Sequence, residues 1–156
     1  MTAVTPRSLP YPLGATLVAG GVDMAVYSET ADSIEFCAFD ETGTETRTIL
    51  TERTGHVFHG IVPGAGVGTR YGLRVHGPWD PANGLRHNAR KLLLDPHATA
   101  VEGEYAWGQA VFGHDQQNPQ EMDSSDSAGS TPRCVITDPP STGPTTPRRA
   151  PRWPTR

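Results

Sequence analysis

The stretch Arg70–Ala98, which reads RYGLRVHGPWDPANGLRHNARKLLLDPHA, decides the fold of this chain. Its first seven residues place apolar side chains at alternate positions, a pattern that predicts a half-buried β-strand over Arg70–His76. A Gly-Pro-Trp-Asp-Pro turn follows, and then a short apolar run at Leu92–Leu94. A run that does not alternate predicts burial on both faces or against a neighbouring domain.

The same alternation continues upstream of Arg70 and defines the rest of the domain. It predicts four further strands at Val22–Val26, Ile34–Phe39, Thr44–Leu50 and Val57–Val62. Five strands about ten residues apart, separated by glycine-rich turns such as Asp40–Gly43, are typical of a β-sandwich. The sequence therefore predicts an all-β sandwich over residues 11–112, preceded by a flexible N-terminus at residues 1–10.

The composition changes after the sandwich. The chain has 156 residues, of which 35% are hydrophobic, enough for one modest core but low for packing along the whole length. From His114 to Arg133 the only large apolar residue is Met122, which predicts a polar linker over residues 113–139. Residues 140–156, PSTGPTTPRRAPRWPTR, are predicted to form a disordered polar tail.

Charge and residue usage argue against several classes of function. A net charge of −4 gives no footprint for nucleic acid, and no apolar stretch has the length of a membrane span or a signal peptide. The two cysteines lie in unlike contexts, which indicates reduced thiols and a cytoplasmic protein. His56 and His59 would point to opposite faces of a strand, so we expect no metal ion and no other cofactor.

The candidate functional residues are two tryptophans and three polar side chains. Trp79 and Trp107 present large rings of the kind that stack on glucose units, and His76, Arg86 and Asn88 could hydrogen-bond sugar hydroxyls. An alternative is structural: Trp79 packs at a seam with another domain and the polar residues hold an irregular loop. A pair of carboxylates across a cleft, which a glycosidase needs, is not apparent, so we expect no catalytic residue.

Several segments together resemble one enzyme family. In order along the chain they are YPLGAT, SIEFCAFDETGTETR, VFHGIVPG, GTRYGLRVHGPWDP and KLLLDP. They resemble the N-terminal domain of bacterial glycogen debranching enzymes of the isoamylase type, over residues 11–139. The resemblance implies an immunoglobulin-like β-sandwich classed with the family-forty-eight carbohydrate-binding modules.

In the resembling enzymes this domain lies beside a (β/α)8 barrel that hydrolyses α-1,6 branch linkages. The barrel's catalytic carboxylates lie downstream of the domain, so the resemblance carries none of them onto this chain. It implies an inactive fragment whose partners are α-glucan, such as glycogen or a branched maltodextrin, and the missing barrel. The alternative is a stand-alone α-glucan-binding module.

The chain departs from the family pattern at two places. Arg86–Ala89 reads RHNA where family members commonly have RFNP, which affects local rigidity rather than the fold. After Pro139 the family continues with a segment like FDWADD and then PRTP. If the reading frame of residues 141–152 is shifted by one base, their codons can spell FDWADDPAPRTP. We therefore expect residues 140–156 to be a frameshifted tail, the alternative being a natural basic tail that binds acidic partners.

Overall fold

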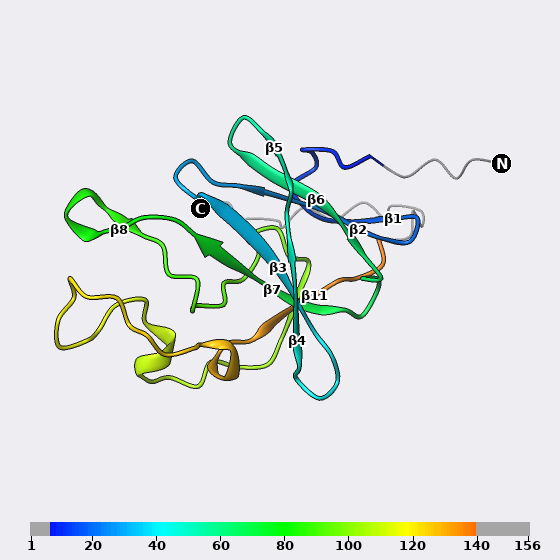
Figure 1. The fold of residues 1–156 in the computed structure, drawn as a ribbon. Coiled ribbons are helices and arrows are strands. Elements are labelled where there is room, and N and C mark those ends of the chain that lie inside the picture. The colour runs from blue at the N-terminus through cyan, green and yellow to red at the C-terminus, as the bar shows by residue number, and fades with distance from the viewer. Residues whose placement is uncertain (1–6, 140–156) are drawn as a thin grey trace, which may run out of the picture.

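The chain folds into two large antiparallel sheets and one small hairpin in this computed structural model, which describes residues 7–139 (Figure 1). The four-stranded sheet has the order β1-β2-β6-β5, with β1 at Gly14–Val18, β2 at Gly21–Tyr27, β5 at Glu52–Thr54 and β6 at Val57–Pro63. The five-stranded sheet has the order β10-β11-β7-β3-β4, with β3 at Ser33–Phe39, β4 at Glu45–Ile49, β7 at Arg70–His76, β10 at Ala100–Glu102 and β11 at Arg133–Val135. The fold is the predicted all-β, immunoglobulin-like sandwich.

The remaining elements are short. A two-stranded hairpin joins β8 (Trp79–Asp80) to β9 (Leu85–Arg86) through the 3₁₀ turn η1 (Pro81–Asn83). Gly84 ends that turn at a φ of 79°, a left-handed conformation that favours glycine. Two more 3₁₀ turns, η2 at Gln109–Val111 and η3 at Ala128–Ser130, lie in the segment between β10 and β11.

The inner core lies between the two sheets and is apolar. Alternate positions of the five predicted strands supply most of it, as the sequence pattern indicates. Its buried members are Val22, Met24, Ala31, Ile34, Phe36, Leu50, Phe58, Val62, Tyr71, Leu73, Cys134 and Ile136. The rings of Phe36 and Tyr71 stack at its centre, with centroids 4.8 Å apart. The Tyr71 hydroxyl donates a hydrogen bond to buried Asp95, so its one polar atom is satisfied.

The other face of the five-stranded sheet is covered as well. We call the residues that cover it, 88–92 and 113–132, the outer layer. Leu92 packs there against Cys37 and Phe39 and lies directly over Gly72. A Cβ atom at Gly72 would lie 2.7 Å from the Leu92 side chain, so glycine is what allows this close approach.

Residues 113–139 therefore do not form the unpacked linker that the composition predicts. Asp126 accepts hydrogen bonds from Arg74, whose side chain is completely buried, and Lys91 donates to Asp123. β11 inserts between β7 and β10, which buries Cys134. The prediction is wrong because it counts apolar residues, whereas ion pairs and backbone hydrogen bonds hold most of this segment.

The ion pairs of the outer layer shift the acidity of their carboxylates. Burial alone would raise the pKa of Glu45, but hydrogen bonds from Arg74 hold it at about 2. The hydrogen bond from Lys91, assisted by one from Ser125, likewise holds the pKa of Asp123 well below its usual range. Both carboxylates are therefore ionised in the folded protein at neutral pH.

The predicted flexible N-terminus also needs correction at its C-terminal end. Ser8 is buried, and its hydroxyl donates to the Asp23 carboxylate on β2 while it lies 2.9 Å from Nδ1 of His59. The other ring nitrogen of His59 lies 2.9 Å from the Thr54 hydroxyl, so both ring nitrogens are occupied within the fold. Residues 1–6 and the predicted frameshifted tail at 140–156 lie outside the described residues.

Candidate functional site

Trp79 and Arg86 face each other across the β8–β9 hairpin, which projects from one end of the sandwich (Figure 1). The Arg86 guanidinium lies 5.9 Å from the centroid of the Trp79 ring. The Trp79 indole N–H donates to the carbonyl of Gln120, and Arg86 donates to the carbonyl of Pro119. The hairpin thus contacts the outer layer through both side chains. For Arg86 this contact supports a loop-holding role, whereas packing of Trp79 at a seam with another domain stays a prediction.

Asn88 follows Arg86 by two residues and both line one apolar cavity, whereas His76 does not line it. The Asn88 side chain is buried, and its amide donates to the carbonyls of Gly113 and Asp123. Asn88 therefore links two loop segments, which is the loop-holding role considered as the alternative to sugar binding. His76 ends β7, and its Nε2 lies 3.0 Å from the Glu35 carboxylate on β3. The structure does not bring the five predicted residues into one site.

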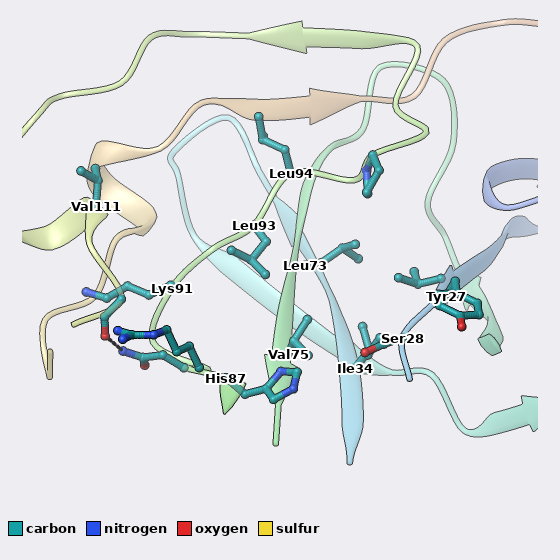
Figure 2. Close-up of a pocket in the computed structure, with 15 residues that line it drawn as sticks. Tyr27, Ser28, Ile34, Leu73, Val75, His87, Lys91, Leu93, Leu94 and Val111 are labelled. Atoms are coloured by element: carbon teal, nitrogen blue, oxygen red, sulfur yellow. Dashed lines mark hydrogen bonds between the residues drawn. The ribbon is translucent and has the colours of Figure 1, made fainter. Parts of the chain in front are cut away.

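An apolar cavity of about 350 Å³ opens between the two sheets near the end of β2 (Figure 2). Leu73, Leu93 and Leu94 lie at its centre in the close-up, with Tyr27 beyond them and Lys91 on the opposite side. Two of these side chains are also exposed to solvent: Tyr27 by 56% and Leu93 by 46%. The cavity is thus an accessible apolar recess in the surface.

The apolar run that sequence analysis predicted to be buried divides between three environments. Leu92 is buried in the outer layer, Leu94 packs against the inner core, and Leu93 borders the cavity. The backbone of Leu93 exchanges two hydrogen bonds with Leu73, which covers part of the β7 edge. Leu93 is therefore held firmly in place while its side chain stays partly exposed.

Trp107 lies in a different part of the surface, between β10 and η2. Its side chain is 77% exposed, the most of any large hydrophobic residue among those described. The ring of Tyr105 stacks on it, with centroids 5.3 Å apart and an interplanar angle of 28°. Trp107 is one of the residues predicted from the sequence, whereas Tyr105 is not; its place against the Trp107 ring emerges only from the structure.

The cavities offer little to acid–base chemistry. The lining of the apolar cavity contains no carboxylate. A second cavity of about 270 Å³ lies beside β1 and β11, and Asp138 is the one carboxylate in its lining. Hydrolysis of a glycosidic bond needs two carboxyl groups held across the bond. Within residues 7–139, no group of three or more potential metal ligands comes together. No helix among the same residues has the length and apolar character needed to cross a bilayer.

Comparisons with known proteins agree with this architecture. Residues 12–98 match the family of carbohydrate-binding module 48, the isoamylase N-terminal domain. The glycogen debranching enzyme of Serratia proteamaculans is 46% identical over 138 residues, which cover 88% of this chain and 20% of that enzyme. A glycogen operon protein GlgX homolog of Mycobacterium tuberculosis is 43% identical over 133 residues, 83% of this chain and 18% of that protein. The chain spans about a fifth of the length of these curated relatives.

Solved structures share the fold at lower sequence identity. The Group B Streptococcus pullulanase SAP superimposes with a TM-score of 0.54 and 19% identity, over 87% of this chain and 16% of the pullulanase. The catalytic module of the pneumococcal glycogen-degrading virulence factor SpuA gives a TM-score of 0.54 at 18% identity, over 89% of this chain and 18% of that module. With more than half of its length matched by one domain family, the chain belongs to carbohydrate-binding module family 48, the isoamylase N-terminal domains.

Proposed function

We propose that this chain is the non-catalytic β-sandwich module of a glycogen-debranching enzyme, which hydrolyses α-1,6 linkages with a separate catalytic domain. The observation that carries the proposal is the match at 46% identity to one fifth of a glycogen debranching enzyme. The absence of paired carboxylates in the two described cavities supports assigning the hydrolysis to another domain. The chain by itself is then inactive, and its ligand is a branched α-glucan.

We further propose that the apolar cavity and its exposed rim form the contact face for the catalytic domain. Such a face needs apolar side chains that are accessible in the isolated module, and Tyr27 and Leu93 meet that requirement. Contacts between domains of one chain resemble protein–protein interfaces with an apolar centre. The four-fifths of each relative that this chain does not match supply a partner of the required size.

We place this function in the cytoplasm. Cys37 and Cys134 are both free thiols in the structure, which is the ordinary state in a reducing compartment. The relatives' names connect them with bacterial glycogen metabolism, which supports the same location.

A complementation experiment tests the proposal. The Serratia debranching enzyme would be made without the fifth that this chain matches, and release of reducing ends from glycogen would be measured with and without this chain. We expect no activity from the chain alone and a several-fold gain when the two are mixed. Leu93→Glu should abolish the gain, because it places a charge on the apolar rim. Ile49→Glu, at a residue of similar exposure on β4, is the matched control and should keep the gain.

The alternative function is a stand-alone α-glucan-binding module. Its mark would be clear retardation of the chain in a glycogen-containing native gel together with no gain of activity in the mixture. Hydrolysis of glycogen by the chain alone would contradict both functions.

A further inference from the structure

We propose that Trp107, supported by Tyr105, is a glucan-binding platform: the open face of the Trp107 ring stacks on a glucose unit of a linear α-1,4-linked segment. The proposal rests on the proposed function for the class of sugar, and on the geometry of this surface for the location. Tyr105 is the positioning residue, because its ring lies against one side of Trp107 and leaves most of the tryptophan exposed.

The exposure of Trp107 is the first step of the argument. A tryptophan buries a large area when it packs, so one that is 77% exposed leaves a large unsatisfied apolar surface. Sugar rings present an apolar face of C–H groups to such a surface and keep their hydroxyls in water. A stacked aromatic pair is therefore a suitable binding surface for a sugar ring.

The backbone that carries the platform is fixed at both ends, which is the second step. Upstream, β10 pairs with β11 in the five-stranded sheet. Between the two rings, the amide of Ala106 donates to the carbonyl of Ser130. Downstream, the carbonyl of Ala110 accepts a hydrogen bond from the buried Lys91 ammonium. Binding a sugar here requires little ordering of the chain, which favours affinity.

The residues around the rings are suited to a neutral, hydroxyl-rich ligand, which is the third step. Glu104 precedes Tyr105 and is exposed, so its carboxylate can accept hydrogen bonds from hydroxyls. Glu102 is paired with Arg70 at 2.6 Å and adds no free charge. An anionic ligand would be repelled by Glu104. Val101 is the only large aliphatic residue exposed within residues 100–108, whereas the centre of a protein–protein interface is a wider apolar patch.

The platform and the β8–β9 hairpin are formed by different segments of the chain. Trp79 has its indole N–H bonded to Gln120 and is only partly exposed, so its ring is committed to holding the outer layer. We therefore expect substitution of Trp107 to weaken glucan binding and substitution of Trp79 to leave it unchanged.

Affinity electrophoresis of the full chain in gels containing glycogen provides the test. We expect Trp107→Ala to weaken the retardation about tenfold in glycogen concentration, and Tyr105→Ala to weaken it less. Trp79→Phe, which keeps an aromatic ring in the hairpin, should leave it unchanged. Tyr11→Ala removes a side chain that is 64% exposed and is the matched control for loss of an exposed aromatic ring. Far-ultraviolet circular dichroism should be the same for all four variants.

Three outcomes overturn the platform in distinguishable ways. If the unsubstituted chain is retarded and Trp107→Ala is retarded equally, the location is wrong while the glucan-binding function stands. If retardation is lost in Trp79→Phe instead, the hairpin is the site. If the unsubstituted chain is not retarded at all, glucan binding itself fails and the platform fails with it, while the complementation experiment still decides the role beside a catalytic domain.

A spectroscopic measurement reports on the ring itself. In a variant with Trp79→Phe and Trp153→Phe, Trp107 is the only tryptophan of the chain. Adding maltoheptaose should shift its fluorescence to shorter wavelength, because a stacked sugar displaces water from the ring. An unchanged spectrum at saturating maltoheptaose, or an equal shift with the β-linked cellohexaose, overturns the assignment to an α-glucan.

Discussion

The two faces of the five-stranded sheet are covered by opposite chemistry. The inner face packs apolar side chains such as Phe36 and Leu73 against the other sheet, while the outer face buries Arg74 and Lys91 beneath a segment rich in serine and aspartate. Both faces exclude water, yet only the inner one shows in the hydrophobic pattern of the sequence. A segment with few apolar residues can therefore be an integral layer of the fold when buried cations provide its attachment points.

Substitution of Arg74 should break the outer layer most severely. Arg74→Ala leaves Glu45 and Asp126 without their buried partner, and we expect a loss of about 3–5 kcal/mol in the free energy of unfolding. Urea denaturation measures the loss. Arg47→Ala is the matched control, because Arg47 also bonds Glu45 but has a side chain that is 44% exposed, and its loss should be below about 1 kcal/mol.

Hydrogen exchange then separates the two faces. Arg74→Ala should remove amide protection mainly from residues 113–132, whereas Phe36→Ala, at the inner core, should remove it across both sheets. Uniform loss of protection in both variants would contradict the division into two separately held layers.

Gly72 sharpens the comparison, because it lies on β7 between the two coverings. Gly72→Ala adds a Cβ 2.7 Å from Leu92, and the resulting overpacking should cost about 1–3 kcal/mol. The double variant with Leu92→Ala should recover part of this loss, and thermal unfolding measures both. If the double variant loses as much free energy of unfolding as the two single variants together, or more, Leu92 is not the side chain that meets the new methyl group.

Acid should release the outer layer before the inner core. The pKa of Glu45 is depressed from the usual 4.5 to about 2, so its contribution to stability is complete above pH 4.5 and is lost as the pH falls toward 2. Allowing for solvent screening of Asp126, whose pKa is also lowered, the loss is on the order of 1–2 kcal/mol. Amide hydrogen exchange of residues 113–132, expressed as protection relative to the unfolded chain at each pH, measures the release, and equal protection at pH 5 and pH 2.5 would contradict it.

The sequence predicts the inner sandwich well because period-two alternation reports directly on a half-buried strand. All five predicted strands occur, with β7 at the predicted Arg70–His76. The missed strands, β1, β5, β10 and β11 and the β8–β9 hairpin, are two to five residues long and show no clear alternation of apolar and polar residues. β11 was hidden further by the polar segment before it.

The sequence suggests residue types for a candidate site but does not give their arrangement. Tryptophan is a residue type suited to stacking on sugar rings, yet the sequence does not distinguish Trp79, whose N–H bonds to Gln120, from exposed Trp107. The roles of Arg86 and Asn88 in holding carbonyls of residues 113–123 depend on contacts across more than twenty positions of the chain. Local patterns carry no information about such pairs.

The two cysteines give each layer its own internal reporter. Cys37 is fully buried beneath Leu92 in the outer layer, and burial raises its thiol pKa to about 12, whereas Cys134 is fully buried in the inner core. Only a thiolate reacts with alkylating reagents, so neither residue is modified at neutral pH while the fold is closed. The rate at which Cys37 is alkylated therefore reports how often the outer layer opens. The rate at which Cys134 is alkylated reports how often the two sheets separate. The two thiols thus allow the two kinds of local unfolding to be measured separately in one protein.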